Sequence, residues 1–415
     1  MTPEEAERYV LDRELFGMRF GLDRMRRMLT ALGSPQLSFG SIHVVGSNGK
    51  SSTTRMIAAI LARHGLRTGV YLSPHLVSFG ERIMVDDAPL TPGEFAAAVQ
   101  RVARAAELVD RSLPDEERVT QFELLTAAAY SELAARGVDV GVIEAGLGGR
   151  YDATNVIPSR VQVLTSVGLE HTRWLGPTIK DIAGEKLDVV QPSGTLVLGY
   201  GLHPDAKALA RSIARERGAR LVQAPADPGV PVGAPGAFQR RNFALAACAA
   251  EAYLGTLDSS AVAAAAAEVR IPRRLEIVGH RPLTVLDGAH NAEGMLALVE
   301  SLPELLTDEE RRPVVAVLSI LADKDAAGML AALLPVCQAV VLTSSHNPRA
   351  LSPATLQSLT QQLGGPPTEI VPDPRAALAR AREVAGSGGV VLATGSLYLV
   401  ADLVRPTSQR RVSVL

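Results

Sequence analysis

Residues 46–52 have the sequence GSNGKSS and follow an apolar stretch, residues 42–45, that predicts a short buried strand. A helix is predicted directly after this turn, up to about residue 64. The backbone N–H groups of a small-residue turn, together with the N-terminus of the next helix, can hold a phosphate chain. Lys50 is then placed to reach the terminal phosphates, and a serine hydroxyl after it can bind Mg²⁺.

This loop departs from the common P-loop pattern at one position. The pattern has a glycine six residues before its lysine, and here that position is Val44. The match is therefore to a shorter GxxGK form. An ordinary strand–turn–helix that binds no ligand is the alternative at this point.

Side chains with suitable chemistry also follow the other predicted strands. Glu144 comes directly after the apolar run 138–143, His171 lies just past 161–167, and Ser73 follows the stretch 65–72. The carboxyl ends of parallel strands share one sheet edge, where ligands bind. A carboxylate there is where P-loop proteins hold a metal ion. The pattern therefore favours a nucleotide and metal site over solvated loop residues.

The elements that must position these residues alternate between strand and helix. Helical stretches at 4–32, 91–111 and 121–136 accompany the strands, which predicts an α/β fold with a P-loop-type, doubly wound parallel sheet. A second alternation begins at 284 and predicts a smaller Rossmann-like α/β domain. We expect an ATP-binding domain over 1–275, a C-terminal domain over 281–415, and an inter-domain linker at 271–282.

Composition narrows the function classes. The 415 residues carry 42 Lys and Arg against 44 Asp and Glu, a net charge of −2, which argues against nucleic-acid or polybasic membrane binding. No apolar run approaches the roughly 20 residues of a membrane span, and the N-terminus lacks a signal core, so we expect a cytoplasmic protein. Only five of the 42 cations are lysines, which draws attention to Lys50 and Lys186.

Several segments together resemble one family. GSNGKSS, YLSPHLVSFGERI, VIEAGLGGRYDATNVI, LDGAHN and TGSLYLV are similar to motifs of the folylpolyglutamate synthase/dihydrofolate synthase branch of the Mur ligase superfamily. The resemblance extends from about Leu22 to Val404. It implies an ATP-dependent ligase that adds glutamate to dihydropteroate, to the glutamyl chain of reduced folates, or to both, through an acyl phosphate.

The resemblance also implies roles for individual residues. Lys50, Glu144, His171, Lys186 and His290 match catalytic positions. The positions that match ATP-binding residues are Gly46, Ser47, Asn48, Gly49, Lys50, Ser51, Ser52, Asn242, Arg274 and Asp287. Those that match Mg²⁺ ligands are Ser73, Glu144, His171 and a carbamylated Lys186. Those expected to contact the pterin substrate are Phe122, Gly148, Gly149, Arg150 and Asp152.

The implied co-substrate is ATP, and the implied cofactors are Mg²⁺, as two ions, with K⁺ as a further option. The implied partners are small molecules only, namely ATP, L-glutamate and a pteroate or folate acid, and the implied state is a monomer. A Mur-type paralogue that joins another acid and amine is the alternative, although the early position of Lys50 leaves no room for an extra N-terminal domain. A P-loop kinase or nucleotide switch would not need the second α/β domain.

The chain departs from the family pattern at several positions. Glu170 replaces the usual Asp before His171, residues 187–189 are Leu-Asp-Val instead of Ala-Gly-Ile, and Phe238 and Arg273 stand where His and Gly are usual. These changes leave the nucleotide and metal residues in place and leave the identity of the acceptor open. His43, inside the strand before the phosphate loop, is expected to be a histidine of the core.

Overall fold

The computed structural model describes residues 1–13, 21–114, 117–306 and 313–405. Contacts divide the chain into two units. Within the described ranges, the first comprises residues 1–233 and 240–269, and the second comprises residues 234–239 and 270–405. The boundary falls inside helix α9 (Ala237–Leu254).

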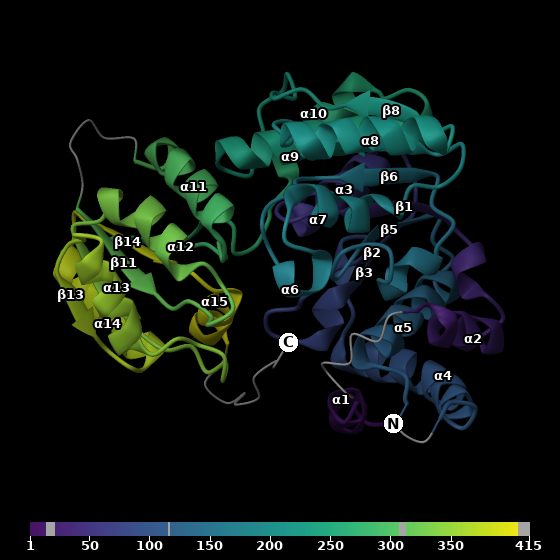
Figure 1. Cartoon of the computed structure of the whole chain (residues 1–415), viewed down its shortest axis with the longest axis horizontal. Helices are drawn as coiled ribbons and strands as arrows, with labels where there is room; N and C mark the ends of the chain where they lie inside the picture. The colour runs from purple at the N-terminus through teal and green to yellow at the C-terminus, as the bar shows by residue number, and fades with distance from the viewer. Residues whose placement is uncertain (14–20, 115–116, 307–312, 406–415) are drawn as a thin grey trace. The chain divides into compact units, whose positions relative to one another are not determined.

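The first unit contains an eight-stranded sheet in the order β4-β3-β2-β5-β1-β6-β7-β8 (Figure 1). Its strands are β1 (Gly40–Val45), β2 (Thr68–Tyr71), β3 (Ile83–Val85), β4 (Ala88–Pro89), β5 (Val140–Glu144), β6 (Val161–Leu164), β7 (Thr195–Leu198) and β8 (Arg220–Gln223). All pairs are parallel except β2–β3 and β3–β4. The central strands are buried on both faces, which explains their continuous apolar sequences.

Helices cover both faces of this sheet. They are α1 (Pro3–Leu11), α2 (Asp23–Ala31), α3 (Lys50–Arg63), α4 (Pro92–Asp110), α5 (Gln121–Ala135), α6 (Thr172–Leu175), α7 (Ile179–Leu187), α8 (Pro204–Glu216) and α10 (Ser259–Glu268), with most of α9. One core joins α1, α2, α4 and α5 to Tyr71 and Ile143, and another joins α7 and α8 to Val45 and Leu164. Helix α3 contacts β1, β2 and β5 and packs on α10.

The second unit contains a six-stranded sheet in the order β13-β12-β11-β14-β10-β9, parallel except for β9 against β10. Its strands are β9 (Glu276–His280), β10 (Leu283–Leu286), β11 (Val314–Leu318), β12 (Ala339–Leu342), β13 (Thr368–Ile370) and β14 (Val390–Thr394). Its helices are α11 (Ala292–Ser301), α12 (Ala326–Leu333), α13 (Pro353–Gln362), α14 (Pro374–Ala385) and α15 (Leu397–Val404). Helices α11 to α13 share one apolar cluster with the sheet, and α14 and α15 share the other.

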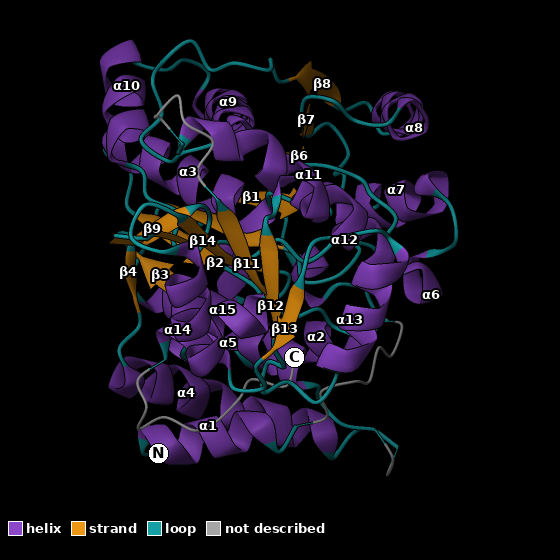
Figure 2. Cartoon of the chain, turned by 90° about the vertical axis from the view of Figure 1, so that its left-hand side faces the viewer, coloured by secondary structure: helices purple, strands orange, loops and turns teal. Residues whose placement is uncertain are grey.

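The predicted fold class is confirmed: two sheets with mainly parallel strands are each flanked by helices, as the colouring by secondary structure in Figure 2 also shows. Two local expectations differ from the structure. The helical stretch predicted at 4–32 consists of two helices, α1 and α2, with residues 14–20 outside the described part. The range 271–282, expected to be a linker, contains strand β9.

Candidate functional site

The turn between β1 and α3 is held open by contacts to the end of β6. Ser47 N donates to Ser166 O at 2.9 Å, and Asn48 N donates to Ser166 Oγ at 2.8 Å. Gly49 has a φ of 83°, a conformation that favours glycine, and a Cβ added there would lie 2.6 Å from Asn242 Oδ1. The structure therefore places Asn242, a residue expected to bind ATP, against the predicted phosphate loop.

Two lysines converge on this loop. Lys50 Nζ donates to Gly46 O at 2.9 Å and to Ser47 O at 3.1 Å. Lys186, from α7, is buried, and its Nζ donates to the same Gly46 carbonyl oxygen at 2.9 Å. The turn thus brings two cationic groups to the point where a phosphate chain would carry its negative charge.

The buried position of Lys186 changes its acid–base properties. Burial lowers the pKa of Lys186 to about 8, and the charge of Lys50 adds to this, while Glu170, 3.3 Å from Nζ, opposes it. Burial raises the pKa of Glu170, but Lys186 and Lys50 outweigh this effect and hold it at about 2. A lysine with a pKa near 8 has a substantial neutral fraction around neutral pH, which an amine needs in order to react with CO₂.

A carboxylate lies beside the loop at the end of β5. Glu144 is buried, its Oε1 accepts from Ser51 Oγ at 2.9 Å, and its Oε2 accepts from Ser73 N at 3.2 Å. Strand β5 lies between β2 and β1, so the residues that follow these three strands meet at one edge. The structure therefore brings together three residues that were predicted separately.

These side chains fit a magnesium ion that keeps most of its other ligands as water and phosphate. In the described ranges no three His, Cys, Asp or Glu side chains are grouped as a metal site. Mg²⁺ needs only one or two carboxylates when substrate phosphates supply further oxygens, and Glu144 with the Ser51 hydroxyl meets this need, while the Ser73 hydroxyl accepts from Arg82 Nη1 at 3.4 Å. His171 is exposed at the N-terminus of α6, just after β6, with a φ of 50°.

A second loop, residues 146–155, follows Glu144 and is here named the acceptor loop. Phe122, in the first turn of α5, packs against it: a Cβ added to Gly146 would lie 2.7 Å from Phe122 Cζ. Gly149 lies against the backbone carbonyls of Glu185 and Lys186. The predicted substrate residues at 122 and 148–149 therefore lie on one side of the sheet edge that carries Glu144.

Two other predicted substrate residues have side chains engaged within the protein. Arg150 pairs with Glu185 at 3.1 Å and with Asp188 at 3.5 Å. The buried carboxylate of Asp152 accepts hydrogen bonds from the N–H groups of Leu147 at 2.8 Å and Thr154 at 3.0 Å. Burial raises the pKa of Asp152, and these donors oppose that effect. Asp152 thus supports the backbone of the acceptor loop.

The remaining predicted residues belong to the second unit and meet around the end of β10. Asp287 is buried, lies 4.0 Å from Arg274, and accepts from the N–H groups of Leu275 and Ala289. Burial raises the pKa of Asp287, and Arg274 opposes this. His290 Nδ1 lies 2.9 Å from Gly288 O. Within this unit the structure therefore brings Arg274 and Asp287 together, with His290 on the same connection.

Comparison with known proteins identifies the family to which this chain belongs. The model for the Mur ligase glutamate ligase domain matches residues 273–397. The folylpolyglutamate synthase of Lacticaseibacillus casei is 35% identical over 413 residues, covering 92% of this chain and 93% of that protein. The dihydrofolate synthase/folylpolyglutamate synthase of Mycobacterium tuberculosis (strain ATCC 25618 / H37Rv) is 34% identical over 411 residues, covering 88% and 84%. The chain belongs to the dihydrofolate synthase/folylpolyglutamate synthase family.

Solved structures of family members have the same fold. Mycobacterium tuberculosis folylpolyglutamate synthase, complexed with ADP and AMPPCP, has a TM-score of 0.88 at 32% identity over 96% of each chain. E. coli FolC in complex with DHPP and ADP has a TM-score of 0.84 at 28% identity over 97% of this chain and 96% of that one. As a member of this family, the chain is an ATP-dependent glutamate ligase. No helix in the described ranges is long and apolar enough to cross a membrane.

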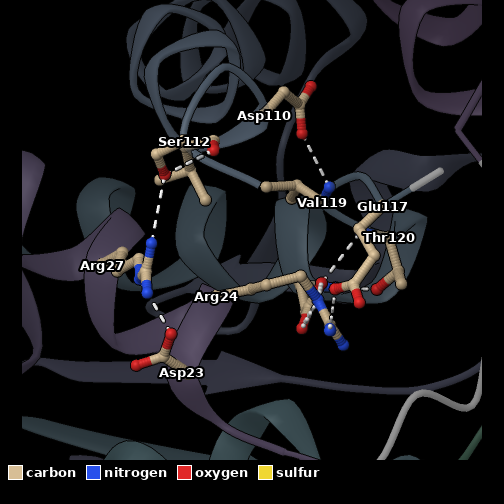
Figure 3. Close-up of polar contacts among 10 residues, drawn as sticks. Asp23, Arg24, Arg27, Asp110, Ser112, Glu117, Val119 and Thr120 are labelled. Carbon is tan, nitrogen blue, oxygen red and sulfur yellow. Dashed lines mark hydrogen bonds and ion pairs between the residues drawn. The ribbon is translucent and has the colours of Figure 1, made fainter. Parts of the chain in front are cut away.

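The structure also contains two side-chain contacts that were not predicted from the sequence. Arg24, in α2, is buried, and its Nε lies 3.1 Å from both carboxylate oxygens of Glu123 in the first turn of α5. Glu123 also accepts from Thr120 N at 2.8 Å. Figure 3 shows Arg24 directed toward the Thr120 end of α5, whereas Arg27 lies between Asp23 and Ser112 and bonds to both. The Thr-x-x-Glu capping pattern at 120–123 was the available signal for this helix start.

The second contact that was not predicted joins His43 to Thr154. His43 is fully buried, as expected for a core histidine, and burial lowers its pKa to about 4. Its Nε2 lies 2.8 Å from Thr154 Oγ1 in the acceptor loop. Nothing in the local sequence of β1 indicates this contact, because Thr154 is distant along the chain.

Proposed function

We propose that this family member joins L-glutamate to the carboxylate of dihydropteroate, of a reduced folate, or of both, and that residues 46–52 and 144 form its phosphate and metal site. The observation that carries the proposal is the convergence of Lys50, Lys186 and Glu144 on the turn after β1. It supports phosphoryl transfer because Lys50 supplies a positive charge, while Glu144 and the carboxylate formed by carbamylation of Lys186 would hold metal ions, so that charge on the transferred group is neutralised on several oxygens at once.

The reaction proposed begins with an attack by the acceptor carboxylate on the γ-phosphorus of ATP. The bond from that phosphorus to the bridging oxygen breaks, ADP leaves, and an acyl phosphate remains. The amino group of glutamate then attacks the acyl carbon, the bond to the phosphate oxygen breaks, and inorganic phosphate and a proton are released. Activation is needed because a free carboxylate is a poor electrophile.

The chain's own residues divide this work. Lys50 and the N–H groups of the phosphate loop would bind the terminal phosphates, and Asn242 lies against the same loop. Glu144, Ser51, Ser73 and His171 would hold Mg²⁺, which when bound neutralises charge on the phosphate oxygens. Phe122 offers an apolar ring for a flat pterin, and the glycines of the acceptor loop allow the backbone to pack closely beside it. Arg274, Asp287 and His290 would act on the nucleotide and on glutamate.

Lys186 would act in its carbamylated form. The neutral amine adds to CO₂ and loses a proton, which converts a cation into a carboxylate. This anion would lie close to Glu170, so a cation would be needed to offset their combined negative charge, and a second Mg²⁺ would supply it. The pKa of about 8 supports the reaction by raising the neutral fraction of the amine. We further propose that the enzyme works as a monomer and that K⁺ is an optional activator.

The experiment that tests this function is acceptor-dependent ADP release. Purified protein receives ATP, Mg²⁺ and L-glutamate with dihydropteroate, with tetrahydrofolate, or with no acceptor. We expect at least one acceptor to stimulate ADP release, and the ratio of the two rates assigns the activity. If neither acceptor exceeds the control, the folate acceptors are wrong and a different acid must be sought.

A further inference from the structure

A buried hydrogen-bond chain links the strand before the phosphate loop to the acceptor loop. His43 lies in β1, three residues before Gly46, and its Nε2 lies 2.8 Å from Thr154 Oγ1. Thr154 Oγ1 in turn lies 2.5 Å from Asp152 Oδ1. All three side chains are buried, so solvent does not compete for these bonds.

Asp152 is the centre of the acceptor loop. Its carboxylate accepts hydrogen bonds from the backbone N–H groups of Leu147 and Thr154. It thereby ties the beginning of the loop to the end. Tyr130 Oη adds a bond to Thr154 O at 2.9 Å and fixes the same end from α5.

The directions of these bonds place the proton on the His43 ring. A hydroxyl group has one proton to donate, and two backbone N–H donors already mark Asp152 as an acceptor. Thr154 therefore donates to Asp152 and accepts from His43, which requires the proton on Nε2. Nδ1 of His43 has no hydrogen-bond partner within the described ranges.

We propose that His43 is a positioning residue for the acceptor loop: through Thr154 and Asp152, its Nε2–H fixes the backbone against which the acceptor acid binds. The inference rests on the proposed function, since it concerns the loop proposed to bind that acid. Asp152 holds the backbone N–H of Leu147, and the residue before it, Gly146, lies directly against Phe122. A loop that loosens at this point would change the surface that Phe122 and the loop present to the acceptor.

The same geometry predicts which substrate is affected. Among the described residues, the phosphate loop is hydrogen-bonded to Ser166 and to the two lysines, whereas the side chain of His43 bonds to Thr154. Loss of the His43 donor should therefore raise the KM for the acceptor and leave the KM for ATP unchanged. A purely structural role in β1 would disturb both, because the strand leads directly into the phosphate loop.

The test uses two pairs of variants in the full-length enzyme. His43→Leu and Thr154→Val remove the donor and the hydroxyl with little change of volume. His43→Gln keeps an N–H donor near the position of Nε2, and Thr154→Ser keeps the hydroxyl. Ser41→Ala is the matched control, because Ser41 is buried two residues earlier on the same face of β1 and its hydroxyl has no hydrogen-bond partner among the described residues.

We expect His43→Leu and Thr154→Val each to raise the acceptor KM about tenfold, as for loss of one buried hydrogen bond. The double variant should be no worse than either single one, and His43→Gln, Thr154→Ser and Ser41→Ala should stay near wild type. An unchanged acceptor KM in the Leu and Val variants, or an equal rise in the KM for ATP, would overturn the inference. If His43→Leu does not fold, the comparison of Thr154→Val with Thr154→Ser tests the inference.

A spectroscopic measurement tests the same point without a substitution at the site. In ¹⁵N-histidine-labelled wild-type enzyme, assigned by the His43→Gln spectrum, we expect a neutral ring with its proton on Nε2 at neutral pH. A proton on Nδ1 would overturn the inference. Failure of the proposed function is distinguishable, because it would be seen in the wild type as ADP release that no acceptor stimulates.

Discussion

Lys50 and Lys186 donate to one and the same oxygen atom: the Nζ of each lies 2.9 Å from the carbonyl oxygen of Gly46. One lysine begins the helix after the phosphate loop, and the other comes from α7, far along the chain. Arginine dominates the cations of this protein, yet lysines occupy both positions. A compact ammonium group can lie on a single carbonyl oxygen, and only an amine can take up CO₂.

The first prediction concerns Lys186. Lys186→Arg keeps a positive charge but cannot form a carbamate, so we expect glutamate ligation to fall by about a hundredfold or more. The control is Lys180→Arg, which changes an exposed lysine at the start of the same helix. Because the pKa of Lys186 is about 8, wild-type activity in CO₂-depleted buffer should recover on adding bicarbonate. Activity near wild type in Lys186→Arg would rule out the carbamate.

The second prediction concerns Glu144. In Glu144→Gln an amide N–H₂ replaces one oxygen and faces either the Ser51 hydroxyl or the Ser73 N–H, both of which now donate to the carboxylate. We expect kcat to fall about a hundredfold and the Mg²⁺ concentration for half-maximal activity to rise. Glu216→Gln, at the exposed end of α8, should change neither value. An unaltered Mg²⁺ titration would contradict a metal-binding role.

The third prediction concerns the buried pair Arg24–Glu123. Arg24→Met leaves a buried carboxylate without its cation, which should cost about 3 kcal/mol of the free energy of unfolding. Glu123→Gln in the same chain should recover part of this loss. Arg27→Met is the control, because Arg27 pairs with Asp23 at the surface and its loss should cost less than about 1 kcal/mol. Urea denaturation measures all three, and equal losses for Arg24 and Arg27 would contradict the assignment.

The fourth prediction is the pH dependence of stability that His43 contributes. Burial lowers its pKa from 6.5 to about 4, so the unfolded chain binds the proton more tightly than the folded one. Stability should therefore fall as the pH falls from 6.5 towards 4, by about 3 kcal/mol in total. His43→Gln lacks this group, and its stability should depend less on pH in that range. Parallel curves for the variant and the wild type would show that His43 is not buried as described.

The fold could be predicted from the sequence where buried strands have a clear pattern of apolar residues. Strands β1, β5 and β6 are continuous apolar runs because both of their faces are covered. Strand β8 is largely exposed and short, and neither its composition nor its length distinguishes it from a loop. The sequence of strand β9 predicts a linker for the same reason, since most of its residues are exposed.

The site could be predicted only in part. Glu144 and the phosphate loop could be predicted because the residues that follow parallel strands lie together at one edge of the sheet. The bonds from Arg24 to Glu123 and from His43 to Thr154 were not, because they join residues far apart in sequence and depend on tertiary packing alone. Asp152 shows the same limit: its sequence position suggested a substrate ligand, and only the structure shows its carboxylate holding the acceptor loop.

The formation of an acyl phosphate is tested most directly by tracing the oxygen atoms of the acceptor carboxylate. The acceptor is prepared with ¹⁸O in its reacting carboxylate and is incubated with enzyme, ATP, Mg²⁺ and L-glutamate, and the released phosphate is analysed by mass spectrometry. The acyl-phosphate route transfers one carboxylate oxygen to phosphate, so each phosphate should carry one ¹⁸O as ADP and the glutamyl amide form. Amide formed together with unlabelled phosphate would contradict the account.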